Sequence, residues 1–505
     1  MTYFSTLKKA VIIGSGFAGL SAACFMAQAG WDVVVLEKQS IPGGRARHFK
    51  DAGFTFDMGP SWYWMPDVFE RFFNCFGKKV SDYYKLHRLN PTYRIYWNDE
   101  LMDIPADYDD LKKFFENIEP GSAVKLDSFM KEAAYKYEVG INKLVHKPGR
   151  SYAEFLDWDL VKGVFKLDVF TSMRKHISKY FKNPKLRQLL EFPVLFLGAL
   201  PQNTPALYSL MNYADLKLGT WYPQEGMYKI VESMYLLAEE LGVKFVFNSN
   251  VSEIKVEGRK AKSVVAISNN KQQVTSNIYP ADVVIGAADY HFIETKLLPE
   301  DCRVYSKQYW DKRVMAPSCL LYYVGLNKKL TGILHHSLFF DSDFEKHGHE
   351  IYTSKQWPTN PLFYVCAPSV TDKTVAPLGH ENLFFLIPVA AGLEGDTEEQ
   401  REKYFEKILN RYEKFVGQPV KDSIIYKKTY SVSDFVNDYN SFKGNAYGLA
   451  NTLMQTANLK PACRSIKIKN LFYTGQLTVP GPGVPPSLIS GEVVAKEALK
   501  YYNQN

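Results

Sequence analysis

The stretch Gly14-Ser15-Gly16-Phe17-Ala18-Gly19 spells the pattern GxGxxG and lies between two apolar segments. Residues 10–13 before it are short and apolar, as in a buried parallel strand. Residues 19–29 are small and mainly apolar, which predicts a helix that Gly30 ends. Residues 32–36 read as a second buried strand, so this region predicts one right-handed βαβ unit.

Each glycine of this pattern has a physical role in binding a dinucleotide. Gly14 permits the tight turn, Gly16 lets the backbone approach a pyrophosphate, and Gly19 lets the helix and strand pack closely. The phosphates then face the helix N-terminus, where free N–H groups and the helix dipole favour negative charge. Glu37 ends the second strand, where its carboxylate can accept ribose hydroxyls and would repel the extra phosphate of NADP. This context predicts dinucleotide binding rather than an ordinary glycine turn before an exposed glutamate.

A second glycine motif distinguishes between FAD and NAD. Six residues beyond Glu37, Gly43-Gly44-Arg45-Ala46 allows a second backbone approach to the pyrophosphate, and Arg45 can neutralise its charge. A nicotinamide dehydrogenase has no use for this second clamp, so the motif favours FAD. The alternative is that Arg45 is a surface residue. Another tight, glycine-assisted turn follows at residues 56–61.

The C-terminal part contains a loop suited to a flat ring. A predicted strand ends at Tyr473-Thr474-Gly475-Gln476, and a Pro/Gly-rich loop follows at residues 480–487. Gly481 and Gly483 let the backbone run against a ring, while the prolines keep the loop rigid. A helix beginning near Ser487 would point its N-terminus at the flavin pyrimidine and stabilise the reduced ring. The alternative is a linker between domains.

Together, these motifs resemble the bacterial-type phytoene desaturase family, carotenoid desaturases within the FAD-containing amine oxidase superfamily. The resemblance rests on GSGFAG with Glu37, PGGRA at 42–46, DMGPS at 57–61, GNAYG at 444–448 and TGQLTVPGPGVPPSLISG at 474–491. The resemblance covers both ends of the chain, whereas the middle third matches only in its general residue pattern. Relatives often carry a glycine pair near positions 225 and 226, where this chain has Glu225-Gly226.

The resemblance implies a set of residues that contact FAD, with Val251 meeting the adenine side through its backbone. The set is Gly14, Gly16, Phe17, Ala18, Gly19, Glu37, Lys38, Gly43, Gly44, Arg45, Pro60, Ser61, Val251, Gly475, Gly483, Val484 and Pro485.

Length and composition limit the remaining possibilities. The 505 residues suffice for two or three packed units, and 46% hydrophobic with 23% charged residues is typical of a folded protein. An aromatic share of 15% predicts either a large aromatic core or an elongated apolar cavity. The net charge of +7 lacks the concentrated basic stripe of a nucleic-acid binder, so we expect no nucleic-acid partner. This charge suits solubility and contact with an anionic membrane equally well.

The sequence also indicates where the protein works. Six scattered cysteines form no metal knuckle and no redox pair, which suits a reducing cytoplasm, and we expect no metal site. The first strand leaves no room for a signal peptide, and no stretch approaches ~20 apolar residues. We therefore expect a cytoplasmic protein with peripheral membrane association.

The predicted fold class is α/β, with a Rossmann-type FAD-binding domain, a mixed-sheet substrate domain and a helical insertion. The FAD-binding domain is discontinuous and comprises residues 1–100, 216–300 and 441–505. Residues 101–215 form the helical insertion, which could face a membrane, and residues 301–440 form the substrate-binding mixed sheet. The apolar run at 192–200, FPVLFLGAL, is open to two interpretations: an entry surface dipping into lipid, or buried core.

The function implied by the resemblance is FAD-dependent desaturation of a long acyclic carotene or hydroxylated carotenoid. Such a substrate is bound by apolar burial, at ~25 cal/mol per Å². Desaturation also requires exclusion of water and an acceptor for one proton. No catalytic residue is identified, and Asp215 and Glu225 are the candidates for that acceptor. His335 and His336 are expected to be structural or surface residues.

Three other functions fit part of the pattern. An amine oxidase would need an aromatic cage and a polar entry, against which the GNAYG and PGPGVPP motifs argue. An FAD-dependent carotene isomerase would leave the mass of its substrate unchanged, and a prenyl-binding escort protein need not keep the flavin loop. The sequence contains one recognisable dinucleotide-binding motif, which is assigned to FAD, so NAD or NADP is not expected to be the oxidant in the site. We therefore expect the electrons to pass to oxygen or a membrane quinone.

Overall fold

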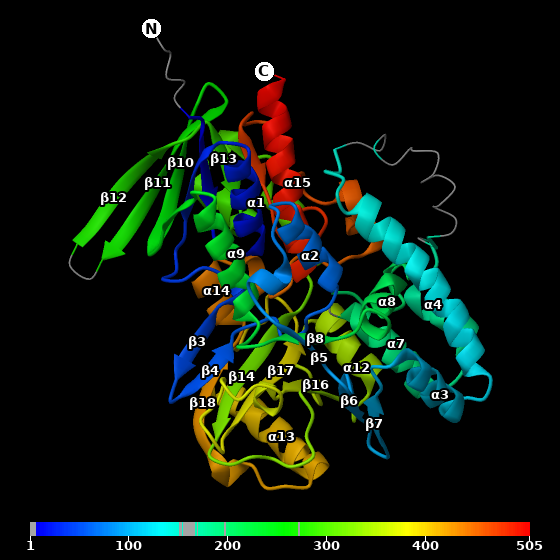
Figure 1. The fold of residues 1–505 in the computed structure, drawn as a ribbon. Coiled ribbons are helices and arrows are strands. Elements are labelled where there is room, and N and C mark those ends of the chain that lie inside the picture. The colour runs from blue at the N-terminus through cyan, green and yellow to red at the C-terminus, as the bar shows by residue number, and fades with distance from the viewer. Residues whose placement is uncertain are drawn as a thin grey trace.

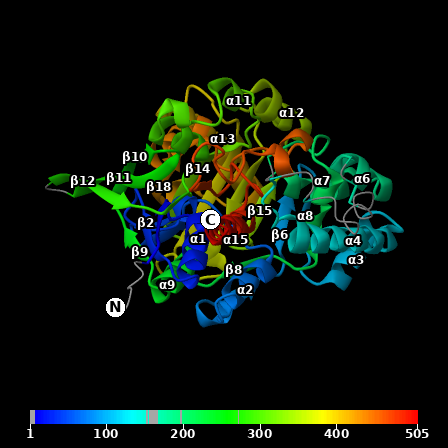
Figure 2. The ribbon, with the colours of Figure 1, turned by 90° about the horizontal axis from the view of Figure 1, so that it is seen from above.

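The computed structural model describes residues 7–150, 154, 167–168, 170–195, 198–270 and 273–504. A five-stranded sheet lies near both termini, and a seven-stranded sheet lies at the opposite end of the molecule (Figure 1). Seen from above, the helical insertion and a three-stranded sheet project on opposite sides (Figure 2).

The five-stranded sheet is entirely parallel, with the strand order β19-β13-β1-β2-β9. Its inner strands are almost wholly apolar and buried, because helices cover one face of the sheet and the three-stranded sheet of β10–β12 covers the other. Its strands are β1 (Lys9–Ile13), β2 (Asp32–Leu36), β9 (Lys244–Val246), β13 (Val283–Gly286) and β19 (Leu471–Tyr473). Helix α1 (Phe17–Gln28) follows β1, so the predicted βαβ unit is confirmed.

The crossover between β9 and β13 carries a three-stranded antiparallel sheet. Its strands are β10 (Ser249–Glu257), β11 (Lys260–Asn270) and β12 (Gln273–Pro280). Helix α9 (Tyr228–Glu240) precedes β9, and the C-terminal helix α15 (Val484–Asn503) packs against α1.

The seven-stranded sheet is mixed, as predicted, because β15 pairs with β6 in parallel and every other pair is antiparallel. Its order is β18 (Ile424–Tyr430), β14 (Ser318–Leu326), β17 (Glu381–Val389), β16 (Phe363–Cys366), β15 (His336–Phe339), β6 (Tyr93–Tyr96) and β7 (Leu101–Ile104). The sheet therefore includes a hairpin from the N-terminal part of the chain.

Strand alternation gives this sheet two different faces. On β14, Leu320 and Tyr322 pack into the core formed with α13 (Glu398–Val416). Cys319 and Leu321 point to the other side, toward the five-stranded sheet. Because successive side chains of a strand face opposite ways, one sheet supplies both a closed core and a wall for the site.

The helical insertion contains five described helices: α3 (Tyr108–Ile118), α4 (Ser122–Val139), α6 (Met173–Tyr180), α7 (Pro184–Leu195) and α8 (Leu210–Leu216). Within the described ranges, no helix has the length and apolarity to cross a membrane.

The apolar run at 192–200 belongs to this insertion. Phe192, Val194, Ala199 and Leu200 are buried. The entry-surface interpretation is therefore wrong for these residues, which pack as core. Phe196 and Leu197 lie outside the described residues.

Candidate FAD-binding site

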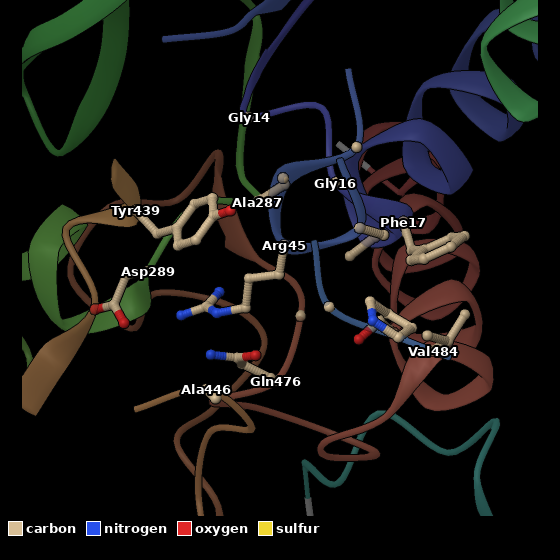
Figure 3. Close-up of a pocket in the computed structure, with 18 of the residues that line it drawn as sticks. Gly14, Gly16, Phe17, Arg45, Ala287, Asp289, Tyr439, Ala446, Gln476 and Val484 are labelled. Carbon is tan, nitrogen blue, oxygen red and sulfur yellow. The ribbon is translucent and has the colours of Figure 1, made fainter. Parts of the chain in front are cut away.

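A cavity extends from the carboxyl ends of β1 and β2 to the inner face of the seven-stranded sheet. Ligands of open parallel sheets bind at such strand ends. Every residue predicted to contact FAD, except Gly19, lines this cavity. Figure 3 shows that Gly14, Gly16, Arg45 and Val484 come together there from distant parts of the chain.

The two glycine motifs are joined directly. The Gly43 N–H donates to the Ser15 carbonyl oxygen at 2.9 Å. A Cβ on Gly44 would lie 3.4 Å from the Gly16 Cα, whereas a Cβ on Gly16 would meet no atom within 4 Å in the part of the chain that the structure describes. The space beside Gly16 is thus open toward the cavity, which fits the close approach of a pyrophosphate to the backbone.

Gly19 acts on the other side of the same turn. A Cβ at this position would lie 2.0 Å from the Gly14 carbonyl oxygen. Gly19 therefore permits close packing of helix on strand, and it does not reach the cavity.

Glu37 is held in place by the turn that precedes α1. Its carboxylate accepts hydrogen bonds from the Ser15 N–H at 2.8 Å and the Ser15 hydroxyl at 2.7 Å, and from the Gln39 N–H at 2.8 Å. An ionised carboxylate has about four acceptor positions, so capacity remains for a ribose hydroxyl. The adjacent Lys38 donates to the Asn437 carbonyl at 2.5 Å, and burial lowers the pKa of its amine.

Arg45 projects into the cavity among Tyr439, Asp289 and Gln476 (Figure 3). Its Nη2 donates to the Ser441 hydroxyl at 3.0 Å, while its buried Nε finds no hydrogen-bond acceptor among the described residues. Burial lowers the pKa of the guanidinium, and Asp289 opposes that effect. An unsatisfied buried donor on a cation fits an anionic ligand, so the interpretation of Arg45 as an outer-surface residue is wrong.

The C-terminal loop ends at the cavity with a helix N-terminus. Gly483, with φ of 115°, precedes α15, which begins three residues earlier than predicted. Pro485 and Pro486 stand in its first turn, where a missing N–H costs no intrahelical hydrogen bond. Residues 482–487 line the cavity, so the positive end of the helix dipole faces it.

The wall opposite the glycine motifs is apolar and aromatic. It comes from residues 62–65, helix α8, the inner face of the seven-stranded sheet and the loop at 444–448: Trp62, Trp64, Met65, Met211, Cys319, Leu321, Tyr364, Leu386 and Tyr447. Apart from the GNAYG motif, which contains Tyr447, the sequence did not identify this wall. Strands β14 and β17 are apolar on both faces, so their sequence did not reveal which face would meet the cofactor.

Two histidines lie behind this wall. His336 stacks on Trp62 with ring centroids 4.2 Å apart, and its Nδ1 lies 2.6 Å from the Tyr364 hydroxyl. Burial lowers the pKa of His335 to about 3. His335, His336 and Cys366 are close enough to hold a metal ion, with ligand atoms within 4.8 Å of one another.

Neither candidate for the proton acceptor lines the cavity. Glu225 is exposed and pairs with Lys229, with 3.1 Å between Oε2 and Nζ, so that prediction is wrong. Asp215 is buried and accepts hydrogen bonds from the Tyr93 hydroxyl at 2.8 Å and the Thr220 hydroxyl at 3.2 Å. Burial raises the pKa of Asp215 to about 7.

Asp57, in the motif DMGPS, has a role that the sequence did not reveal. Its carboxylate accepts the N–H groups of Met227 at 2.8 Å and Tyr228 at 2.9 Å, at the beginning of α9. Burial raises the pKa of Asp57 to about 6. The motif therefore anchors a helix that packs against the five-stranded sheet, in addition to presenting Pro60 and Ser61 to the cavity.

Comparison with known proteins agrees with this geometry. The family model for flavin containing amine oxidoreductases matches residues 17–499. A carotenoid 3,4-desaturase of Haloarcula japonica is 41% identical over 97% of each chain. A zeta-carotene-forming phytoene desaturase of Myxococcus xanthus is 29% identical over 98% of this chain and 94% of its own.

Solved structures share the fold at low sequence identity. A redesigned putrescine oxidase superposes with a TM-score of 0.64 at 12% identity, covering 99% of both chains. An oxidoreductase from Methanosarcina mazei gives a TM-score of 0.61 at 15% identity, covering 97% of this chain and all of its own.

The fold and the cavity define an FAD-dependent oxidoreductase. The chain belongs to the flavin containing amine oxidoreductase family and, within it, to the carotenoid desaturases.

Proposed function

We propose that this protein is an FAD-dependent desaturase that removes hydrogens from a long acyclic carotene or a hydroxylated carotenoid. The 41% identity to a carotenoid 3,4-desaturase over nearly the whole of both chains carries this proposal. The apolar wall of the cavity supports it, because a carotenoid offers no charge for the protein to bind.

The residues that line the cavity support one orientation of FAD. The pyrophosphate would lie on the N-terminus of α1 beside Gly16 and Gly44, with the ribose at Glu37 and the adenine side near Val251. Arg45 would neutralise the phosphates. The flavin would lie at the C-terminal motif, near Gly475, Gly483, Val484 and Pro485. Lys38 would stand beside Glu37 at the ribose, and Phe17, Ala18, Gly43, Pro60 and Ser61 would contact the rest of the cofactor.

The chain itself contributes orientation and a dry environment. The bound FAD supplies the two-electron acceptor. Trp62, Leu321 and Leu386 exclude water from the reacting carbons and align the polyene. In this division of work, residues 1–100, 216–300 and 441–505 would bind FAD, and residues 301–440 would form most of the substrate-binding sheet, which β6 and β7 complete. Residues 101–215 would form the helical insertion, which could face a membrane.

The decisive experiment supplies the FAD-loaded enzyme and lipid with a panel of acyclic carotenoids. We expect products lighter by two hydrogens per step, absorbing at longer wavelength. A product of unchanged mass would instead indicate the isomerase. Purified protein without flavin absorbance near ~450 nm would favour the escort protein, since flavins absorb there. Oxidation of amines with no effect on carotenoids would favour an amine oxidase.

Peripheral membrane contact and the electron acceptor belong to the same proposal. In the helical insertion, Val124 and Phe170 expose 73% and 84% of their surfaces, and the exposed Lys175 and Lys179 follow Phe170 on α6. Apolar and basic side chains of this kind suit a lipid surface. Flotation with anionic liposomes, reversed in part by high salt, tests the contact. Reoxidation of the reduced enzyme by oxygen or by a quinone tests the acceptor.

A further inference from the structure

Lys460 is a buried lysine behind the loop that closes the cavity. Only 5% of its surface is exposed. Its Nζ lies 3.0 Å from the Asn451 Oδ1, and among the described residues Asn451 is its hydrogen-bonding partner. A neutral amide oxygen does not balance the charge of an ammonium group.

The amine touches the flavin-side loop from outside the cavity. A Cβ on Gly481 would lie 3.0 Å from the Lys460 Nζ and 3.1 Å from the Asn451 Oδ1. The next two residues, Pro482 and Gly483, line the cavity, and Gly483 precedes α15. The backbone of this loop therefore separates the Lys460 ammonium from the cavity, close to the N-terminus of α15.

An ammonium group buried without an anion is costly, and buried charges are normally paired. Burial lowers the pKa of Lys460 to about 7, with no acidic group opposing this shift. The charged groups around the nearby Cys463 are Glu154, Arg150 and Glu497, of which the last two pair with each other at 2.8 Å. The uncharged titratable neighbours are Tyr290 and Tyr305, whose hydroxyls bind the Ala462 backbone, and Cys463 itself. Burial raises the pKa of all three, so they carry no charge near neutral pH.

Another buried lysine of the chain shows the contrast. Lys136 in α4 is fully buried, but its Nζ lies 3.9 Å from the Asp168 carboxylate. Lys460 lacks such a partner among the described residues, so an anion for it has to come from a bound group.

We propose that Lys460 supplies the positive charge that balances the negative charge of two-electron-reduced FAD, and thereby sets the reduction potential of the cofactor. FAD takes up two electrons and one proton from the reductant, and the Lys460 amine takes up a second proton from solvent. This inference requires FAD in the cavity but does not depend on the identity of the substrate.

The proposal predicts how the potential varies with pH. For a two-electron couple a tenfold change in equilibrium equals about 30 mV, so each proton taken up contributes about 30 mV per pH unit. Above about pH 7 the Lys460 amine is neutral before reduction and charged after it. The wild-type potential should therefore change by about 60 mV per pH unit there, for two protons.

The experiment measures the reduction potential of the FAD-loaded enzyme against reference dyes between pH 6 and 9. Lys460→Met should lower the reduction potential at pH 7 by ~30 mV, which corresponds to a tenfold change in the equilibrium constant. The potential of this variant should change by ~30 mV per pH unit. Lys460→Arg keeps the charge at every pH, so it should restore the potential at pH 7 and still show the smaller slope. Lys136→Met removes an equally buried amine far from the loop and should behave as wild type.

A Lys460→Met enzyme with the wild-type potential and slope would overturn the proposal. If that variant does not retain FAD, the Lys460→Arg enzyme decides alone, because an unchanged slope in it would exclude proton uptake by Lys460. Carotenoid turnover enters neither measurement, so a wrong substrate assignment would leave this result intact.

Discussion

A Cβ on Gly19 would lie 2.0 Å from the Gly14 carbonyl oxygen, although the two residues belong to one glycine motif whose middle member faces open space. The motif thus serves two separate purposes. Gly19 holds α1 against β1, and Gly16 leaves room for the ligand. Substitutions at the two positions should therefore fail in different ways.

Gly16→Val should abolish FAD retention without unfolding the protein. The new side chain meets no protein atom near its Cβ and occupies the space open to the pyrophosphate. We expect a colourless protein whose apo form unfolds within a few degrees of the wild-type apo form. A yellow, fully loaded variant would show that the phosphates bind elsewhere.

Gly19→Ala should destabilise the fold itself. Its methyl group overlaps a backbone oxygen that cannot move without distorting the turn, so we expect a loss of about 3 kcal/mol or more in the free energy of unfolding. Urea unfolding of the apo protein measures this. The same substitution at Gly30, where a Cβ would meet nothing within 4 Å but φ is 83°, should cost only about 1 kcal/mol.

Arg45→Lys should weaken FAD binding while keeping the positive charge. Lysine lacks the planar guanidinium group of Arg45. In that group, Nη2 donates to the Ser441 hydroxyl, and the buried Nε has no acceptor among the described residues. We expect the Kd for FAD to rise by a factor of about 10 to 100, or ~1.4–2.8 kcal/mol. Arg47→Lys is the matched control, because Arg47 pairs with Asp438 and does not line the cavity. An equal loss in both variants would argue against a direct contact between Arg45 and FAD.

Asp215→Asn should remove a pH-dependent part of the stability. The folded-state pKa of Asp215 is about 7, above the 3.8 of an unperturbed aspartate, so the folded protein binds the extra proton. That stabilisation is fully present below about pH 4 and is lost as the pH rises through about 7. The free energy of unfolding of Asp215→Asn relative to wild type should therefore rise by up to about 4 kcal/mol between these pH values. Urea titrations at pH 5, 6, 7 and 8 measure it, and a constant difference would contradict the argument.

Glu225→Gly should stabilise the protein. Glu225 has a φ of 74°, a left-handed conformation that favours glycine. Relief of this strain is worth about 1 kcal/mol, whereas the exposed ion pair with Lys229 contributes little. Glu225→Gln removes the charge and keeps the strain, so it should show no gain. Thermal unfolding of the two variants separates backbone strain from charge.

The N-terminal βαβ unit, the C-terminal motif and FAD as cofactor could be predicted from the sequence because their physics is local. A glycine turn, two apolar strands and a carboxylate at a set spacing are sufficient to place a dinucleotide. The confirmed strands β1 and β2 and the GxGxxG turn between them all lie within residues 9–36.

The tertiary structure decided what depends on contacts between distant residues. Asp57 caps a helix that begins 171 residues later, and Lys460 meets Gly481 although strand β19 lies between them in the chain. The apolar wall arises because one face of the seven-stranded sheet happens to meet the five-stranded sheet. Alternation along a strand shows that two faces exist, but only packing determines which of them encloses the cofactor.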